Sequence, residues 1–576
     1  MSLHSENKCF ENVEIAQINL LAGGLKENSK KIARTIRNAE ENKLNLVIFP
    51  ENALIGILPN EVLLRYPFII DESLKWLDGL SKLTLNTNAL VSFVDKNLKQ
   101  SIALLTEGKI IKIISSDEVF TINNHNYGIL LSGLNNFSVS ALKKQGAEVV
   151  IYCKSTISRT GNEDALQNDL SEIAEFNKIP IIYINSVGAT DNFSYEGASR
   201  GVNANGEIFV LAKSFEEDFI TFNPFKDNEV LSQKTVCENI KDEFSLDYEF
   251  DLERTYKTIV QGIKDYFSKC NLKRAVLGLS GGLDSTVCAV LLTDALGKEN
   301  VFGISMPSKL TSDESKSDAK ELAKRLGINF EEISIKQVVE TTTTCLSPLF
   351  ENIEGVWKDR YRNSFTPDNI QARARATYLW CISNEFPFCI PIATSDKSEA
   401  YMGYATINGD MSGGFAPIAD VTKTKLFALA RWLNKNRKEK NAIPESIILK
   451  KPGAELAINP KTGKTLNAED ALMPYEFLDE IIWRIENKHE KYDDLVCSKF
   501  VYEEKMQISK EQKIEWIDKF FNRMSKAHYK WLIFPPSVIV DSQSINSAVY
   551  RQPVTSGRIN YKGNSSDEIS FILNEN

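Results

Sequence analysis

The stretch Ala275-Val-Leu-Gly-Leu-Ser-Gly-Gly-Leu-Asp-Ser285 constrains this 576-residue chain more than any other. An apolar run typical of a buried strand ends at Ser280, a glycine pair follows, and an amphipathic helix is expected from about Thr286. A strand, a tight turn and a helix N-terminus together can hold polyphosphate, because backbone N–H groups and the helix dipole face the anion. The sequence therefore predicts an α/β domain with a phosphate-binding loop.

The residue types in this loop indicate its phosphate chemistry. Gly281 and Gly282 let the backbone approach an anion closely, Ser280 and Ser285 add hydroxyl donors, and Asp284 can hold the magnesium that accompanies a nucleotide. The lysine-bearing loop of kinases and GTPases, G-x-x-x-x-G-K-[ST], does not occur in the sequence. The loop instead resembles the S-G-G-x-D-S motif of the N-type ATP pyrophosphatases, which split ATP between the α and β phosphates to adenylate a substrate. A ligand-free serine and glycine turn is the alternative, and the match at a strand-to-helix junction disfavours it.

Length and composition limit the other classes of function. A chain of 576 residues exceeds what one hydrophobic core supports, so at least two domains are expected. The net charge of −9 argues against a nucleic-acid-binding surface. No apolar stretch approaches the ~20 residues that span a bilayer, and the N-terminus has no signal-peptide core, so we expect a cytoplasmic protein without membrane contact. The nine cysteines include no C-x-x-C pair and are expected to be buried and reduced.

Two domains are predicted, residues 1–245 and 246–576, because a polar, acidic connection separates two stretches of alternating strands and helices. In the first stretch a helix is expected at 28–43 and strands at 13–20, 44–49, 89–94, 102–105, 127–131, 148–152 and 179–185. In the second, a helix from residue 256 leads to the phosphate loop, and a doubly wound parallel sheet is expected from the strands at 301–306 and 330–335 and the helix at 314–326.

Three further clusters follow the loop, and each alone has a structural explanation: a capped helix, a capping turn and an ordinary glycine-rich loop. They are Asn369-Ile-Gln-Ala-Arg373, Phe388-Cys-Ile-Pro-Ile-Ala-Thr-Ser-Asp-Lys-Ser-Glu399 and Gly409-Asp-Met-Ser-Gly-Gly-Phe-Ala-Pro417. In this order after S-G-G-L-D-S they resemble NAD synthetase. The resemblance runs from about 256 to 530 and includes Ile443-Pro-Glu-Ser446 and Lys451-Pro-Gly-Ala-Glu-Leu456.

This resemblance implies a set of site residues. Those that contact ATP would be Gly278, Leu279, Ser280, Gly281, Gly282, Leu283, Asp284, Ser285, Thr394 and Lys423. Deamido-NAD would contact Asn369, Arg373, Glu399 and, across a subunit boundary, Lys530. Asp284 and Glu399 would hold Mg²⁺, and Asp284 and Lys397 are the predicted catalytic residues. The nicotinate carboxylate is a poor electrophile, so the family first adenylates it with loss of pyrophosphate, and ammonia then displaces AMP.

The chain departs from the family pattern at two places. The family's Thr-Gly-Asn-Lys-Ser-Glu occurs here as Thr394-Ser-Asp-Lys-Ser-Glu399, which is a mild change. The basic residues that usually follow Tyr529-Lys530 are replaced by Trp531-Leu-Ile, which affects the predicted C-terminal contacts with the substrate.

The first half contains segments of the nitrilase/amidase family, which implies an α-β-β-α sandwich. They are Leu46-Val-Ile-Phe-Pro-Glu-Asn-Ala-Leu-Ile-Gly56, Gly146-Ala-Glu-Val-Val-Ile151 and residues 185–199. In glutamine-dependent NAD synthetases this domain hydrolyses glutamine with a Glu-Lys-Cys triad and passes ammonia on. Glu51 is present here, but Ser116 and Ser132 stand where the lysine and cysteine are expected.

Several residues offer substitutes for the lost triad members. Ser132 itself or Cys153 is a candidate nucleophile, and Lys109 or Lys112 a candidate displaced lysine. A serine hydroxyl without a base has no route to activation. Decay explains the combined losses better, so we predict an inactive pseudo-glutaminase and an enzyme that uses free ammonia or ammonia from another protein.

Other hypotheses stay open at this stage. A glutamine-dependent enzyme with a non-standard site, another N-type pyrophosphatase amidotransferase such as a GMP or asparagine synthetase, and a non-catalytic nucleotide-binding scaffold are the alternatives. Retention of Asp284, Thr394 and Glu399 speaks against a scaffold. The resemblance implies a homo-oligomer, either a dimer of synthetase domains or an octamer.

Overall fold

The computed structural model describes residues 11–226, 230–231, 244, 249–359, 365–453 and 468–546. The chain divides into two compact units, Met1–Ile240 and Lys241–Asn576. The domain boundary expected after residue 245 lies outside the described residues and stays a prediction.

The first unit contains two six-stranded sheets. The first has the order β14 (Asp218–Phe222), β1 (Val13–Gln17), β2 (Leu46–Ile48), β3 (Asn88–Val94), β4 (Gln100–Thr106), β5 (Lys109–Ile114). The second has the order β13 (Ile208–Leu211), β12 (Arg200–Val202), β9 (Ile181–Ile184), β8 (Val149–Cys153), β7 (His125–Ile129), β6 (Glu118–Ile122). A separate antiparallel hairpin joins β10 (Val187–Thr190) and β11 (Phe193–Glu196).

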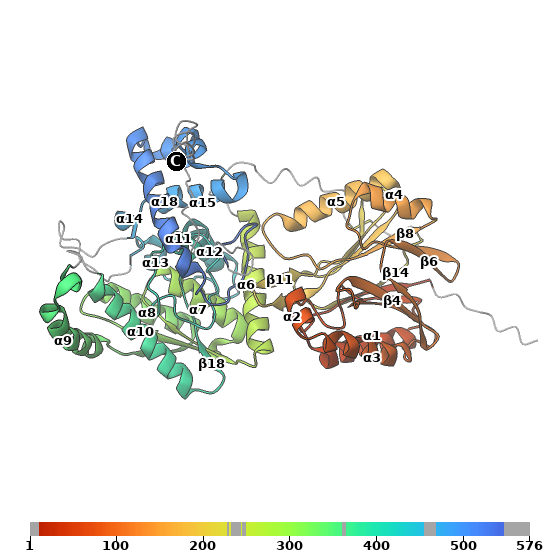
Figure 1. The fold of residues 1–576 in the computed structure, drawn as a ribbon, viewed down its shortest axis with the longest axis horizontal. Helices are drawn as coiled ribbons and strands as arrows, with labels where there is room; N and C mark the ends of the chain where they lie inside the picture. The colour runs from red at the N-terminus through yellow and green to blue at the C-terminus, as the bar shows by residue number, and fades with distance from the viewer. Residues whose placement is uncertain are drawn as a thin grey trace, which may run out of the picture. The chain divides into compact units, whose positions relative to one another are not determined.

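These sheets pack face to face, with helices on their outer faces (Figure 1). The outer helices are α1 (Leu25–Glu41) and α3 (Phe68–Ser81) on the first sheet, and α4 (Asn136–Lys144) and α5 (Asn162–Asn177) on the second; α2 (Asn60–Arg65) precedes α3. Residues on alternate positions of each strand face either the helices or the other sheet. In β1, for example, Ile15 joins the core between the sheets, whereas Ala16 joins the core beneath α1. The α-β-β-α sandwich predicted from the nitrilase resemblance is confirmed.

The second unit is built on a four-stranded parallel sheet. Its order is β17 (Asn329–Glu332), β16 (Val301–Ser305), β15 (Arg274–Gly278), β18 (Cys389–Pro391). Strand β15 comes first in the chain but lies between β16 and β18. The chain continues from β15 to β16 and β17 on one side, and then crosses back to β18 on the other side. In parallel α/β sheets, ligands bind at the carboxyl ends of the strands at such a reversal.

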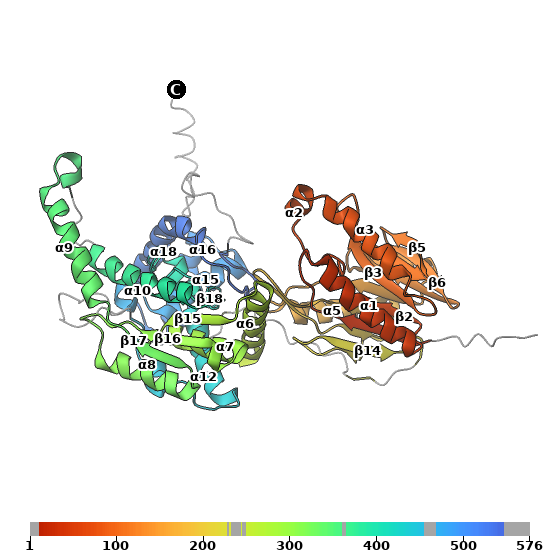
Figure 2. The same ribbon diagram turned by 90° about the horizontal axis from the view of Figure 1, so that it is seen from below.

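Helices cover both faces of this sheet (Figure 2). Ala275 and Leu277 point to the face covered by α6 (Glu249–Lys269), α7 (Leu283–Leu296), α8 (Asp313–Leu326) and α12 (Lys423–Asn436). The intervening Val276 points to the face covered by α10 (Thr366–Glu385), against which α9 (Lys336–Asn352) packs. The predicted doubly wound sheet is confirmed.

A helical layer follows α12 and encloses a third apolar core around Phe477, Phe500 and Phe520. Its helices are α14 (Ala468–Ala471), α15 (Tyr475–Lys488), α16 (Tyr492–Cys497), α17 (Val501–Met506) and α18 (Lys510–Trp531), whereas α13 (Glu445–Leu449) packs against α12 in the core of the sheet. The short helix α11 (Lys397–Tyr401) packs against α18 and α15, and two short 3₁₀ helices span Lys298–Asn300 and Gly355–Lys358. Of the predicted motif at 451–456, residues 454–456 lie outside the described residues.

Two sequence expectations were wrong in detail. The helix expected from Thr286 begins at Leu283, because the glycine pair alone forms the turn and Asp284 already lies in the first helical turn. The cysteines were expected to be buried, but Cys270, Cys345, Cys381 and Cys497 are exposed, because local apolar runs do not tell which face of a helix is covered.

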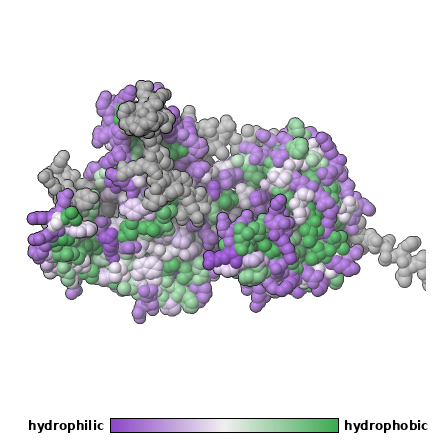
Figure 3. Space-filling model, in the orientation of Figure 1, coloured by the Kyte–Doolittle hydropathy of each residue, from purple (hydrophilic) through white to green (hydrophobic). Residues whose placement is uncertain are grey.

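The surface of both units mixes hydrophilic and hydrophobic residues on the face shown in Figure 3. Exposed large apolar side chains include Phe68, Phe137, Phe176, Val356 and Trp357. None of the described helices is both long and apolar enough to cross a membrane.

Candidate active site

The predicted phosphate loop follows β15 directly and turns sharply into α7. Gly281 has φ +74°, and a Cβ atom at this position would collide with the backbone carbonyl of Ser315 in the first turn of α8. Ser280 Oγ accepts a hydrogen bond from Gly282 N–H at 3.2 Å, which closes the turn. Gly282 is the N-cap of α7 and has no side chain to satisfy the first N–H groups of that helix. These donors are therefore available to an anion.

The segment Thr394–Glu399 follows β18, which pairs with β15, so it lies at the same edge of the sheet as the loop. Asp396 is the N-cap of α11, and its Oδ1 accepts a hydrogen bond from Glu399 N–H at 2.9 Å. Capping fixes the start of this helix and therefore the direction of the Glu399 side chain. Thr394 is half-buried just before the cap.

Lys423, at the first position of α12, brings the acids of these two segments together. Its Nζ lies 2.6 Å from Asp284 Oδ1, 2.7 Å from Asp396 Oδ2 and 3.1 Å from Glu399 Oε1. Burial opposes the charge on Lys423, but the three acids outweigh it and hold its pKa well above the usual value. Burial also raises the pKa of Glu399 well above its usual value, and Lys423 offsets this only in part. The cluster therefore carries more acid than one lysine compensates.

This cluster fits a magnesium ion. Carboxylate oxygens of Asp284, Asp396 and Glu399 lie within 4.8 Å of one another. Mg²⁺ prefers hard oxygen ligands and is commonly bound by one or two carboxylates together with substrate phosphates. Asp396 was not among the residues predicted for the site. Its capping position between Thr394 and Glu399 was the available clue.

The residues predicted for deamido-NAD gather around one loop of the same chain, residues 403–410. Asn369 Oδ1 accepts a hydrogen bond from Thr406 Oγ1 at 2.8 Å, and Arg373 Nε donates to the Ile407 carbonyl at 3.2 Å. Lys530 Nζ donates to the carbonyl of Gly403 at 2.8 Å, and burial lowers its pKa. The predicted contact of Lys530 across a subunit boundary stays a prediction.

Lys397, predicted to be catalytic, points into a different ion cluster. Its ammonium group is fully buried and contacts Glu486 at 2.8 Å, Asp541 at 3.2 Å and the Gln543 carbonyl at 2.8 Å. Lys425 is also buried and pairs with Asp541, at 3.1 Å. The geometry gives Lys397 the task of fixing α11, next to Glu399, and offers no support for contact with reacting phosphates.

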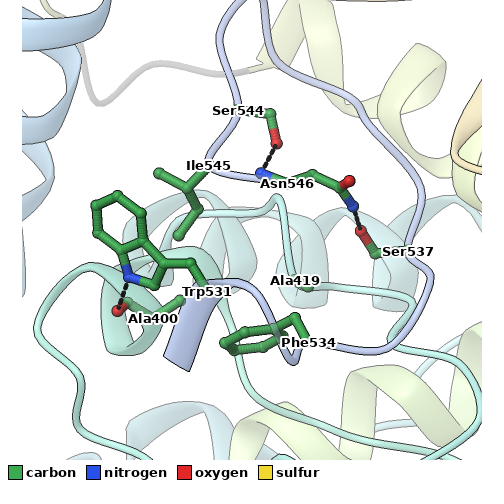
Figure 4. A pocket seen from close by; sticks show the side chains of 8 residues that line it. All are labelled: Ala400, Ala419, Trp531, Phe534, Ser537, Ser544, Ile545 and Asn546. Carbon is green, nitrogen blue, oxygen red and sulfur yellow. Dashed lines mark hydrogen bonds between the residues drawn. The ribbon is translucent and has the colours of Figure 1, made fainter. Parts of the chain in front are cut away.

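The C-terminal segment secures the same short helix from another side (Figure 4). Trp531 Nε1 donates to the Ala400 carbonyl at 3.0 Å, and a small hollow beside it is closed by Ile545 and Phe534. Asn546 Nδ2 donates to Ser537 Oγ at 2.6 Å and holds the segment in a turn. Residues far apart in the sequence thus determine where Glu399 lies.

In the first unit, Glu51 is the one predicted triad residue present, and it already has an internal partner. Its Oε1 lies 2.7 Å from Lys154 Nζ, and its Oε2 accepts a hydrogen bond from Ser155 N–H at 2.8 Å. Lys154 directly follows β8 and was not predicted. The candidates that were considered lie on β5, where Lys109 is exposed and Lys112 pairs with Glu118 at 2.7 Å.

The candidate nucleophiles are also engaged or shielded. Ser132 Oγ donates to Asp117 Oδ2, and its backbone N–H donates to Asp117 Oδ1 at 2.9 Å. Ser116, at the expected lysine position, is exposed. Cys153 is buried within β8, and burial raises the pKa of its thiol, which disfavours the reactive thiolate.

Comparison with known proteins agrees with both halves of this description. The family model described as NAD synthase matches residues 255–519. A glutamine-dependent NAD(+) synthetase from Synechocystis is 32% identical over 86% of this chain and 92% of its own length. One from Thermotoga maritima is 32% identical over 82% of this chain and 88% of its own length.

The chain belongs to the NAD synthetase family. Two solved structures of NAD synthetases extend this likeness over both units. The glutamine-dependent enzyme from Acinetobacter baumannii, in complex with ADP, has a TM-score of 0.67 at 25% identity and covers 94% of this chain and 98% of its own. The enzyme from Cytophaga hutchinsonii has a TM-score of 0.76 at 18% identity, which shows the shared fold. The NAD synthase match contains the phosphate loop, α11 and Lys423.

Proposed function

We propose that this chain forms NAD from deamido-NAD, ATP and ammonia, with release of AMP and pyrophosphate. One observation carries the proposed use of ATP: Asp284, Glu399 and Lys423 converge where the strand order of the parallel sheet reverses. A glycine loop and the uncapped N-terminus of α7 lie beside them. NAD synthetase relatives that match over both units, and a solved neighbour in complex with ADP, support nucleotide binding by this chain.

The reaction needs charge stabilisation more than a covalent nucleophile. A carboxylate oxygen of the nicotinate group attacks the α phosphorus, the bond to the bridging oxygen breaks, and pyrophosphate leaves. Ammonia then attacks the acyl carbon, loses a proton, and AMP departs with the carboxylate oxygen. The α7 N-terminus and Lys423 would stabilise charge on the phosphates, because preorganised donors act most strongly where charge develops. Mg²⁺ held by Asp284 and Glu399 would neutralise the leaving pyrophosphate.

On the same grounds, Asn369, Arg373 and Lys530 would hold deamido-NAD at the 403–410 loop. All three are bound to this loop or its carbonyl groups in the structure. Asn369 and Arg373 each make one hydrogen bond with the loop and Lys530 makes two, so a ligand needs to replace only a few contacts with its own. Lys397 has no part in the chemistry under this proposal, since its ammonium group is sealed among Glu486, Asp541 and Gln543.

The residues at the expected glutaminase positions of the first unit bear on which molecule donates the nitrogen. Glutamine hydrolysis by a nitrilase-type site needs a thiolate, a lysine and a free glutamate base. Here Glu51 pairs with Lys154 and accepts a hydrogen bond from the Ser155 amide. The Ser132 hydroxyl donates to Asp117, and the Cys153 thiol is buried. The named relatives are glutamine-dependent, so the competing proposal is a glutamine-dependent enzyme in which Lys154 replaces the missing lysine. Ser132 would still lack a free base.

Isotope labelling separates the two donors. The full chain is supplied with deamido-NAD, Mg-ATP and either [¹⁵N]ammonium or glutamine labelled at its amide nitrogen, and the mass of the NAD formed is measured. We expect label from ammonium only, and no glutamate release from glutamine. NAD that carries the glutamine label at a rate comparable with ammonium would overturn the ammonia proposal and leave the synthetase assignment intact.

A further inference from the structure

The acids around Lys423 differ in their access to solvent, and this divides their tasks. Asp284 and Glu399 keep 25% and 16% of their side chains exposed, whereas Asp396 is fully buried. A ligand that enters from solvent can therefore reach Asp284 and Glu399. It cannot reach Asp396 without first moving Lys423, whose side chain is 1% exposed.

Asp396 is also fixed in direction. Its Oδ1 accepts the hydrogen bond from Glu399 N–H at 2.9 Å, which leaves Oδ2 for Lys423. Oδ2 lies 2.7 Å from Nζ, and no other described residue donates to this buried oxygen. One oxygen of Asp396 thus forms an ion pair with Lys423, while the other caps the N-terminus of α11.

Lys423 uses its charge on all three acids. An ammonium group has three N–H donors and a compact charge. A divalent cation that takes Asp284 and Glu399 would release two of these contacts. The backbone N–H of Lys423 stays anchored to Ser398 Oγ at 2.8 Å, so only the side chain needs to adjust.

We propose that the Lys423 ammonium group is the internal cation of this cluster in the free enzyme, and that Asp396 retains Lys423 when Mg²⁺ takes Asp284 and Glu399. Lys423 then competes with Mg²⁺ in the absence of nucleotide and turns its released donors to phosphate oxygens when Mg-ATP binds. Asp396 is a positioning residue for Lys423, at the place where the family pattern has asparagine. This inference rests on the proposed use of Mg-ATP at this site.

Binding of Mn²⁺ to the full chain without nucleotide tests the competition, with free Mn²⁺ measured by electron paramagnetic resonance. Lys423→Met and Lys423→Gln should bind Mn²⁺ at least about tenfold more tightly than wild type, because the internal cation is gone. The matched control is Lys425→Met, on the same helix and equally buried but paired with Asp251 and Asp541. It should bind Mn²⁺ as wild type does.

Thermal unfolding gives a second measurement in case either Lys423 variant folds poorly. Mn²⁺ should raise the unfolding temperature of these variants by several degrees more than that of wild type or Lys425→Met. Asp396→Asn keeps a good helix cap but loses the charge, so it should weaken Mn²⁺ binding with little change in unfolding temperature. Lys423 variants that gain neither Mn²⁺ affinity nor metal-dependent stability would overturn the inference. Such a result leaves NAD formation by the wild type unaffected, so failure of this proposal and of the proposed function are distinguishable.

Discussion

Glu51 with its partners Lys154 and Ser155 in the first unit, and the Lys423 cluster in the second, both contain buried or half-buried acids, but their charges are arranged differently. In the first, one carboxylate meets one lysine and one backbone N–H, and both of its oxygens are used. In the second, three carboxyl groups share one lysine, and two of them still reach solvent.

This arrangement of charges distinguishes a closed ion pair from a cluster that can accept a ligand. Burying a charge is costly unless it is paired, so a chain without a ligand to bind gains from internal pairing. Surplus charge of one sign, retained next to an anion-binding helix terminus, is tolerated where a ligand of the other sign compensates it. The shared family fold does not reveal this, whereas the local charge arrangement does.

The largest expected effect on NAD formation comes from neutralising Asp284, compared with neutralising Glu51. Asp284→Asn should lower NAD formation with ammonium at least about a thousandfold, because charge stabilisation of this kind supplies several kcal/mol. Glu51→Gln should leave the same rate within about twofold. Steady-state rates at saturating ammonium compare them, and an equal loss in both variants would break the contrast.

A methyl group in the phosphate loop should have the next largest effect. Gly281→Ala places Cβ against the Ser315 carbonyl at a positive φ, so the loop or α8 must shift. We expect ATP affinity to fall about a hundredfold and the unfolding temperature to drop. Gly79→Ala, on α3 of the first unit, is the control, because an added Cβ there would meet nothing within 4 Å. Calorimetric titration with ATP and thermal unfolding measure both variants, and similar losses in the two would argue against this packing.

Glu14, on β1, provides a pH test of the first unit, because no described cation forms an ion pair with it. Burial raises its pKa from 4.5 to about 7, and its Oε1 has no hydrogen-bond partner among the described residues. The folded state binds the Glu14 proton more tightly than the unfolded state does. The contribution of Glu14 to the free energy of unfolding is therefore largest below pH 4.5, falls as the pH rises toward 7 and is constant above that. Glu14→Gln should raise the free energy of unfolding by about 2 kcal/mol at pH 8 and have little effect near pH 4.5.

Denaturant titrations of the full chain from pH 4.5 to 8 measure this effect. Glu172→Gln, an exposed acid on α5, is the control and should change stability little at any pH. A Glu14→Gln variant with the pH profile of the wild type would show that Glu14 is charged and compensated in the folded chain.

The smallest effect is expected when the ion pair between Glu51 and Lys154 is broken. Lys154→Met leaves Glu51 partly buried without its cation and should destabilise the chain by about 1 kcal/mol, since Lys154 itself is half exposed. The double variant Glu51→Gln, Lys154→Met should recover most of this loss. Both should form NAD from ammonium at the wild-type rate. A gain of glutamine hydrolysis in Lys154→Met would instead show that the ion pair only masks a working site.

Much of the fold was predictable from local pattern. The strands near 13–20, 44–49 and 148–152 correspond to β1, β2 and β8, because alternating or continuous apolar runs reflect burial directly. The glycine pair after β15 likewise marked the turn to α7. Interactions between distant segments were not predictable in this way, as Lys154, Asp117 and Asp396 show.

Those partners depend on how the sheets and helices pack against one another. Lys154 meets Glu51 although 103 positions separate them, and Lys423 meets Asp284 across 139 positions. Lys397 looked catalytic in its motif, yet α15 and the C-terminal segment supply the groups that enclose it.

The sequence alone predicted the α/β architecture of both units and the glycine turn after β15. These follow from periodicity and residue chemistry within short segments, where neighbours in the chain are neighbours in space. Contacts between distant segments were visible only in the folded chain: Glu51 meets Lys154, Lys397 meets Glu486 and Asp541, and three acids surround Lys423. Electrostatic energies depend on distance and burial, and only the packing of segments that are distant in the chain sets these.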